Sequence, residues 1–209
     1  MKNHIKTNES NLKLCVFVAI KESVMSNYNC KNIIVIEGSP RKGGNSDTLS
    51  DSFIEGATSK GHKVVKVYVK DLELKFCTAC DACTHNGKCV HKDGMDEVLE
   101  TMVESDVIMF VTPVYFYSMS ALMKCFIDRC RPRYREIKNK KFIFLVVAAD
   151  SNKDNLESTM LALKGFVDCL SGDNEIEKIY APGLWKKHDV NNDAFKSLRL
   201  SLKQMGEFV

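Results

Sequence analysis

The sequence lacks the long apolar run that a membrane-spanning helix requires. Its nearest candidate, residues 14–20, falls far short of the roughly 20 residues that such a helix needs. It also lacks a strong excess of one charge, because 30 Lys and Arg stand against 27 Asp and Glu, a net charge of +3. That balance is too mild to indicate a nucleic-acid-binding surface. We therefore expect a cytoplasmic protein that binds neither membranes nor nucleic acids.

Proline is scarce as well, with four residues, and there are eleven glycines. A hydrophobic fraction of 44% and a charged fraction of 27% exclude disorder and collagen-like repeats, and 209 residues suit one domain. Cysteine, by contrast, is abundant, with nine residues. The number is odd and the chain is too long for a small disulfide scaffold, so the cysteines are expected to do chemistry or hold a metal in a reducing compartment.

The first residues show no clear element. The short apolar segment 14–20 follows several lysines but lacks a small-residue cleavage site, which argues against a signal peptide. We expect residues 1–31 to be an N-terminal extension and residues 32–209 to be the only domain. Met25 lies a few residues before the first clear strand, and we hypothesise that the natural chain begins there.

From residue 32 onward, apolar runs of strand type alternate with helical periodicity. Strands are predicted at 33–36, 64–69, 107–111, 142–149 and 176–180, and helices at about 49–61, 95–102 (capped by Asp93), 120–130, 156–170 and 194–206. Repeated strand–helix order predicts a parallel sheet with helices on both faces. We therefore expect an α/β, flavodoxin-like, doubly wound five-stranded sheet of order 2-1-3-4-5, with a Cys-rich loop after strand two. Ligands should bind beyond the carboxyl ends of its strands.

The turn after the first predicted strand is rich in glycine and hydroxyl groups. It reads Gly38-Ser-Pro-Arg-Lys-Gly-Gly-Asn-Ser46. Gly44 stands where a P-loop carries lysine, and the G-x-G-x-x-G pattern is absent, so neither an NTP site nor a Rossmann site is favoured. Free backbone N–H groups at a helix start, together with Arg41, can bind a monophosphate. The alternative is an ordinary turn with a helix cap at Asn45 or Ser46.

Four cysteines form the most specific motif, C-x2-C-x2-C-x5-C, at Cys77, Cys80, Cys83 and Cys89. Three cysteines at this spacing let one loop surround an iron–sulfur cluster, as in bacterial ferredoxin runs, and Cys89 would complete the set. Zinc is the main alternative, although structural zinc sites usually present two separated pairs. A surface loop of free thiols is the third possibility, and it would be prone to oxidation.

The segment after the third strand, residues 112–120, interleaves polar backbone with aromatic side chains. Such a loop suits a flat heteroaromatic ligand, or else an oligomer interface.

Other residues have simpler interpretations. The basic run from Arg129 to Lys141 is expected to be a solvated connection, Cys125, Cys130 and Cys169 to be buried packing residues, His85 and His91 to face solvent, and Trp185 to pack within the C-terminal segment.

Taken together, these motifs resemble the NAD(P)H-dependent FMN reductases, and more narrowly the iron–sulfur flavoproteins of anaerobic prokaryotes. The matching segments are Gly38–Arg41 with Gly44–Ser46, the four-cysteine run, and Pro113–Phe116 followed by Ser120-Ala121 and Ile127–Arg129. The resemblance implies that FMN phosphate is held by Ser39, Arg41, Asn45, Ser46 and Thr48, and that Pro113, Val114, Tyr115 and Phe116 contact the flavin ring. It further assigns Ala149 and Asp150 to a third FMN loop, although the glycine usual there is absent.

The resemblance implies an oxidoreductase in which NAD(P)H reduces FMN, and electrons then pass singly through a 4Fe-4S cluster to a small-molecule or protein acceptor. It also implies a homodimer or homotetramer. Two alternatives remain open, namely a non-catalytic electron carrier and a four-cysteine metal or redox sensor without FMN. Small carrier flavodoxins tend to be strongly acidic, so the net charge of +3 speaks mildly against the first.

Overall fold

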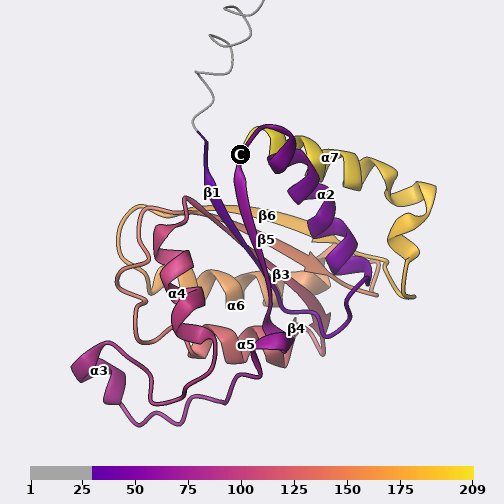
Figure 1. The fold of residues 1–209 in the computed structure, drawn as a ribbon. Helices are drawn as coiled ribbons and strands as arrows, with labels where there is room; N and C mark the ends of the chain where they lie inside the picture. The colour runs from indigo at the N-terminus through magenta and orange to yellow at the C-terminus, as the bar shows by residue number, and fades with distance from the viewer. Residues whose placement is uncertain (1–29) are drawn as a thin grey trace, which may run out of the picture. The chain divides into compact units, whose positions relative to one another are not determined.

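The computed structural model describes residues 30–209, and the expectations for residues 1–29, including a start at Met25, lie outside them. Residues 31–209 make up one unit built around a twisted sheet (Figure 1). Its five long strands are parallel neighbours in the order β2-β1-β3-β5-β6. Their bounds are β1 Asn32–Glu37, β2 Lys63–Tyr68, β3 Val107–Tyr115, β5 Lys141–Val147 and β6 Glu175–Ala181. Counted in chain order this is 2-1-3-4-5, so the predicted fold class is confirmed.

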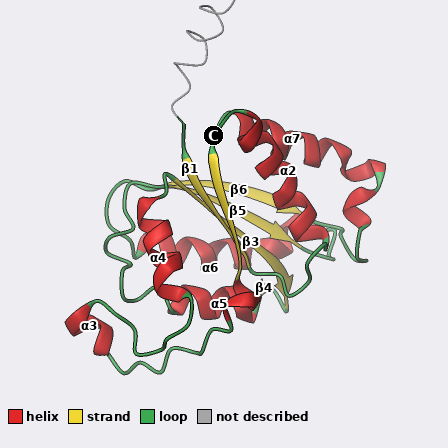
Figure 2. Cartoon of the chain, viewed as in Figure 1, coloured by secondary structure: helices red, strands yellow, loops and turns green. Residues whose placement is uncertain are grey.

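Helices cover both faces of the sheet, as Figure 2 shows. α2 (Asn45–Ser59) and α7 (Lys196–Glu207) cover one face, and α4 (Met95–Glu104), α5 (Ala121–Asp128) and α6 (Glu157–Asp168) cover the other. Short 3-10 turns lie at Val69–Leu72, Lys153–Leu156, Asp189–Asn191 and Asp193–Phe195. The Cys-rich segment after β2, predicted to be a loop, contains one short helix, α3 (Ala82–Asn86).

Each face of the sheet carries its own hydrophobic core. One core combines the β-strand side chains with α4, α5 and α6, and its aromatic centre is Phe110 with Phe142 and Phe144. The other lies under α2 and α7. These two helices approach so closely that a Cβ atom on Gly206 would lie 2.1 Å from the Phe53 carbonyl oxygen. The glycine therefore permits the contact that holds the C-terminal helix in place.

Two local predictions were wrong. The strand predicted at 107–111 continues to Tyr115 and turns back into a two-residue strand, β4 (Ser118–Met119), so most of the predicted loop is a hairpin. Pro113 fits in this extension because it pairs with Val147, the last residue of β5, where the ladder between the two strands ends. Helix α4 is not capped by Asp93: Gly94 is its N-cap and no side chain caps it, because the Asp93 carboxylate is engaged elsewhere.

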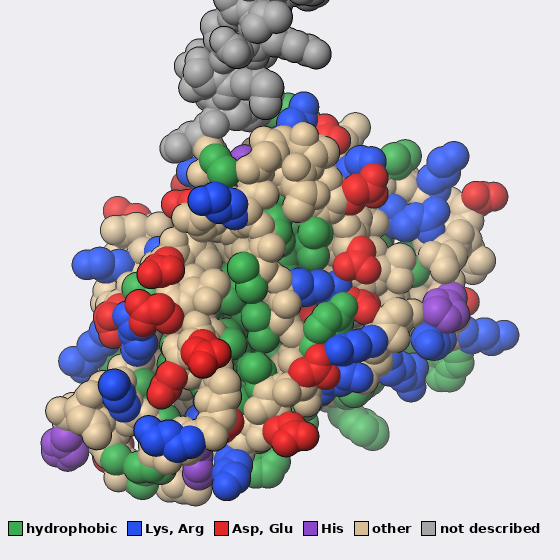
Figure 3. Space-filling model, viewed as in Figure 1, with side chains coloured by type: hydrophobic (Ala, Val, Ile, Leu, Met, Phe, Trp, Pro, Cys, Tyr) green, Lys and Arg blue, Asp and Glu red, His purple; other side chains and the backbone are tan. Residues whose placement is uncertain are grey.

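Among the described residues, no helix is long and apolar enough to cross a membrane. Figure 3 shows acidic and basic side chains interspersed over the face that it views. This mixed pattern agrees with the near-balanced charge of the sequence.

Candidate functional site

Two candidate sites lie at opposite ends of α5. Ser120, the N-cap of this helix, belongs to the edge formed by the carboxyl ends of the strands. Arg129 follows the last residue of the helix and lines a cavity formed by the cysteine segment. An eight-residue helix spans about 12 Å, so the fold itself fixes how far apart these two places are.

Ser120 joins the turn that follows β1 to the end of β3. Its hydroxyl donates to the Gly38 carbonyl oxygen at 2.6 Å, and its backbone N–H donates to the Thr112 hydroxyl at 3.0 Å. A Cβ atom on Gly38 would lie 2.9 Å from the Cβ of Met123, so this approach requires glycine. The turn after β1 and the end of β3 are therefore held together, as a ligand that contacts both would need.

The turn after β1 leaves a helix N-terminus available. The N-cap of α2 is Gly44, which offers no side chain, so the alternative of an ordinary cap at Asn45 or Ser46 is wrong. The N–H groups of the first helical residues have no acceptor within the helix. The Ser39 hydroxyl accepts from the Arg41 backbone N–H at 3.2 Å, and the exposed Arg41 guanidinium has no protein partner in the described part of the chain. These groups fit an anionic phosphate.

The other predicted phosphate ligands differ in whether their side chains are free to bind a ligand. Ser46 is buried at the second helical position, and the Thr48 hydroxyl donates to the Gly44 carbonyl oxygen at 3.0 Å. The Asn45 side chain is occupied, because it donates to the Lys186 carbonyl oxygen at 2.8 Å and accepts from the Val190 N–H at 3.2 Å. Asn45 thus ties the C-terminal segment to the turn, a role that its sequence position did not reveal.

A buried carboxyl group lies directly beneath this turn. Glu37, the last residue of β1, is fully buried and accepts from the Ser39 backbone N–H at 3.0 Å. Burial raises the pKa of Glu37 from 4.5 to about 8, against the opposing effects of the Ser39 N–H and the Lys66 ammonium. Glu37 follows the strand predicted at 33–36 and was not among the predicted site residues. An acidic residue that closes an otherwise apolar buried strand was the signal that could have singled it out.

The predicted ring-binding residues follow the end of β3. Pro113 and Val114 are partly buried, Tyr115 is exposed, and the Phe116 side chain is fully exposed, at 100%. Phe116 and Tyr117 form the turn of the β3–β4 hairpin with φ values of 50° and 60°. Positive φ is unfavourable for bulky residues, and such strain concentrates at functional sites.

The third predicted loop follows β5. Asp150 is exposed, and its carboxylate accepts from the Asn152 N–H at 2.8 Å and from the Asn155 side chain at 2.6 Å, which lowers the pKa of Asp150. Its carbonyl oxygen accepts from Gly183 N–H. Ala149 is exposed beside it. The loop is thus internally bonded and lies at the same edge of the sheet as the other two.

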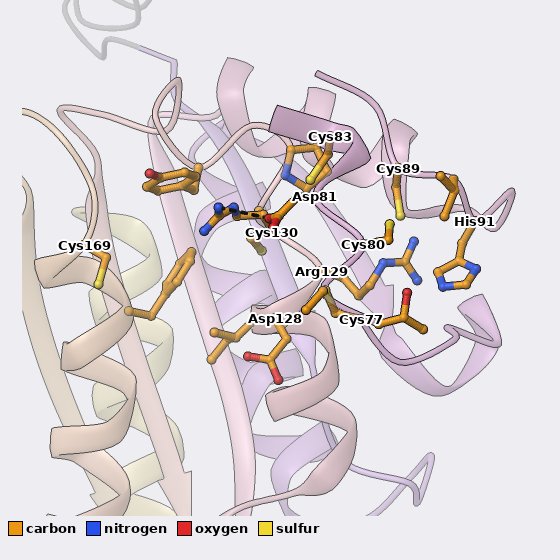
Figure 4. Close-up of a pocket in the computed structure, with 18 residues that line it drawn as sticks. Cys77, Cys80, Asp81, Cys83, Cys89, His91, Asp128, Arg129, Cys130 and Cys169 are labelled. Carbon is orange, nitrogen blue, oxygen red and sulfur yellow. Dashed lines mark hydrogen bonds and ion pairs between the residues drawn. The ribbon is translucent and has the colours of Figure 1, made fainter. Parts of the chain in front are cut away.

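The four predicted metal ligands line one cavity. Cys77, Cys80, Cys83 and Cys89 all line a space of about 760 Å³ between the cysteine segment and the end of α5 (Figure 4). Burial raises the pKa of the Cys83 thiol. Within residues 30–209, no group of three or more His, Cys, Asp or Glu side chains is placed to hold a metal ion.

A buried ion pair closes the cysteine segment. The Arg129 guanidinium donates to both carboxylate oxygens of Asp93, at 2.7 and 2.8 Å, and to the Lys75 carbonyl oxygen at 2.7 Å. Lys75 precedes the four cysteines and Asp93 follows them, so one side chain joins both ends of the segment. The bond from Arg129 lowers the pKa of Asp93. Only 1% of Arg129 is exposed, so the prediction that it belongs to a solvated loop was wrong.

Three further predictions on this region are settled by burial. Cys125 and Cys130 are buried, as predicted, and burial raises the pKa of both thiols. Cys169 is exposed and lines the same cavity, so its assignment to the core was wrong. His85 is exposed as predicted, but the Nε2 atom of His91 is buried and His91 lines the cavity. Trp185 is 75% exposed, so the prediction that it packs within the C-terminal segment was also wrong.

The residues of the cavity fit an iron–sulfur cluster in their chemistry. Four thiols, the preferred ligands of such clusters, line one space.

The doubly wound sheet and its ligand-binding edge define the class of flavodoxin-like proteins. A family model described as NADPH-dependent FMN reductase matches residues 31–171. An iron–sulfur flavoprotein of Methanocaldococcus jannaschii is 32% identical over 179 residues, covering 79% of this chain and 92% of that protein. The chain therefore belongs to the NADPH-dependent FMN reductase family and, within it, to the iron–sulfur flavoproteins.

Further similarities agree with this assignment. An iron–sulfur flavoprotein of Archaeoglobus fulgidus is 39% identical over 97 residues, which cover 46% of this chain and 44% of that protein. The matched region thus spans less than half of that relative. The azoreductase of Bacillus anthracis has the same fold, with a TM-score of 0.68 over 85% of this chain and 99% of that one, at 13% identity.

Proposed function

We propose that the chain is an FMN-dependent oxidoreductase that takes electrons from NAD(P)H and passes them, through a 4Fe-4S cluster in the cysteine segment, to a small-molecule or protein acceptor. The grouping of four thiols around one cavity, in a chain of the FMN reductase family, is the observation that carries this proposal. When bound, FMN takes two electrons and a proton as hydride and the cluster takes single electrons, so together they connect a two-electron donor to one-electron chemistry.

On the FMN side, the chain supplies an anion site and a ring site. The backbone N–H groups at the start of α2, the hydroxyls of Ser39 and Ser46 and the guanidinium of Arg41 would bind the phosphate. Since the Asn45 side chain is occupied, its contribution would come from its backbone N–H. Thr48 would support the turn through its bond to Gly44. Pro113–Phe116 and the Ala149–Asp150 loop would border the flavin ring.

The replacement Arg41→Ala is expected to weaken FMN binding by about 10- to 100-fold, the usual effect of losing one charge-assisted hydrogen bond. The dissociation constant can be measured from the quenching of flavin fluorescence. Lys42→Ala is the matched control, because Lys42 is adjacent and equally charged but is bound to Asp71 at 2.5 Å. An equal loss in both variants would mean that Arg41 acts only through net charge.

One sample decides between the proposed function and its alternatives. Anaerobically purified protein should contain flavin, iron and acid-labile sulfide together, and NADPH should bleach its flavin absorption. Zinc in place of iron, or iron without flavin, would favour the metal or redox sensor. Flavin that NAD(P)H fails to reduce would favour the electron carrier.

We also propose that two or more copies of the chain assemble. The fully exposed Phe116 and the exposed Trp185 are large apolar side chains that water solvates poorly, and a second copy could cover them. The molar mass, measured by light scattering as the protein elutes from a size-exclusion column, tests the assembly. A mass equal to that of one chain at micromolar concentration would contradict it.

A further inference from the structure

A buried carboxylate holds the turn that would bind the FMN phosphate, residues 38–46 (the phosphate turn). Asp47, the third residue of α2, is only 3% exposed, and its Oδ2 atom accepts from the Gly43 N–H at 2.6 Å. Gly43 has a φ of 67° and precedes the N-cap Gly44, which has no side chain to cap the helix. The Asp47 side chain therefore fixes how the chain approaches the N–H groups at the start of α2.

Two side chains of the edge strand β2 hold Asp47 in place. The Tyr68 hydroxyl donates to Asp47 Oδ1 at 3.0 Å, and the Lys66 ammonium forms an ion pair with the same carboxylate. Lys66 also donates to the Asp47 carbonyl oxygen at 3.3 Å and to the Asp51 carboxylate at 2.7 Å. These three acceptors match the three N–H bonds of an ammonium group, so Lys66 is not expected to contact a ligand itself.

The charge of Asp47 conflicts with a phostate-binding role of the turn beside it. Burial opposes the ionisation of Asp47, but its hydrogen bonds, foremost the one from Lys66, outweigh this effect and lower its pKa. Asp47 is therefore charged at neutral pH, and a phosphate at the start of the same helix would be a second anion near it. The Lys66 ammonium offsets this repulsion. Its charge also opposes the rise in the pKa of Glu37 that burial causes, so it acts on both acidic groups beside the phosphate turn.

We propose that Lys66 is a positioning residue that makes the phosphate turn select FMN over riboflavin, which lacks the phosphate. It does so by neutralising the carboxylate that holds the turn, not by contacting the ligand. This inference rests on the proposed function, because it requires FMN at this turn. Without Lys66, Asp47 would hold the turn with a buried, unpaired negative charge next to the phosphate. That charge would weaken the binding of FMN and leave riboflavin, which is neutral, unaffected.

The test is the ratio of the dissociation constants of riboflavin and FMN, measured at pH 7 on the full chain freed of its flavin, by the quenching of flavin fluorescence. Lys66→Met keeps the length of the side chain and removes its charge. FMN should bind this variant about 10- to 100-fold more weakly than the wild type, and riboflavin should bind as before. Lys63→Met is the matched control, because Lys63 is exposed at the start of the same strand, and it should keep the wild-type ratio.

A double variant, Lys66→Met with Asp47→Asn, restores the balance of charge. The new amide can still accept from the Gly43 N–H and can donate to the Tyr68 hydroxyl, so the turn stays held. The ratio should therefore return close to the wild-type value. This recovery distinguishes an effect of charge from a loss of structure, and it decides alone if Lys66→Met does not fold.

The outcomes separate the inference from the proposed function. Equal weakening of FMN and riboflavin binding in Lys66→Met would show a merely structural role and overturn the inference, as would an unchanged ratio. A double variant whose ratio stays low would also overturn it, since Lys66 would then act on the phosphate directly. In each of these cases the wild type still binds FMN, so the proposed function stands. A wild type that binds no FMN would overturn both.

Discussion

Replacing Cys80 by serine is expected to abolish cluster binding and to leave FMN bound. Iron should fall from about four per chain to near zero, because a serine hydroxyl is a poor substitute for a thiolate ligand. FMN should remain, since the phosphate turn and the β3 hairpin are held by Gly38, Thr112 and Ser120, none of which belongs to the cysteine segment. Iron, sulfide and flavin assays on the same sample measure both effects.

Cys169→Ser is the control for this change. Cys169 lines the same cavity and is exposed, as Cys80 is, but lies outside the four-cysteine run, so its replacement should leave the iron content unchanged. Equal loss of iron in both variants would show that the ligand set extends beyond the run. Loss of flavin together with iron in Cys80→Ser would mean that the cysteine segment supports the FMN site.

The strands and helices were predictable because their signals are local, and the order 2-1-3-4-5 followed from the doubly wound fold that five such parallel strands suit. Buried parallel strands are continuous β-branched runs, such as Ile33–Ile36, and each predicted helix has its own apolar periodicity. The spacing of the four cysteines is likewise contained in thirteen residues. Such patterns need no knowledge of what the rest of the chain does.

The errors arose where burial depends on distant partners. Arg129 stands at the start of a basic run, and only its bidentate contact with Asp93, 36 residues earlier, explains how it can be buried. The same contact removes Asp93 from the helix cap that its position suggested. The burial of His91 Nε2 and the exposure of Cys169 depend in the same way on how the cysteine segment lies against the end of α5.

Glu37 is the residue whose replacement should change the pH dependence of stability most. Its pKa is about 8 in the folded protein and near 4.5 when exposed, so folding takes up a proton between these values. The stability that the neutral form provides is therefore complete below pH 4.5 and is lost as the pH rises toward 8. Each pH unit is worth about 1.4 kcal/mol, so the free energy of unfolding should fall by roughly 3–5 kcal/mol across this range.

Glu37→Gln should remove this decline, because the amide is neutral at every pH and can still accept from the Ser39 N–H. Urea unfolding between pH 5 and 9 measures the effect. The charged groups that act on Glu37 are Lys66 and Asp47, and the pKa of Asp47 is lowered, so it titrates below this range. Glu55→Gln is the control, an exposed glutamate of α2 paired with Lys203, and it should keep the wild-type decline. A wild-type curve that is level between pH 5 and 8 would contradict the assignment.

The same carboxyl group should make FMN binding depend on pH. A phosphate bound at the start of α2 would stand above Glu37, and a second negative charge beneath it is unfavourable. We expect FMN affinity of the wild type to fall by about tenfold between pH 7 and pH 9 as Glu37 ionises, and that of Glu37→Gln to change little. The phosphate itself is fully ionised over most of this range. If the FMN affinity of Glu37→Gln falls as much as that of the wild type, the pH dependence comes from a group other than Glu37. If the affinity of Glu37→Gln does not fall over this range, the pH dependence comes from Glu37, the buried carboxyl group that accepts from the Ser39 N–H of the phosphate turn.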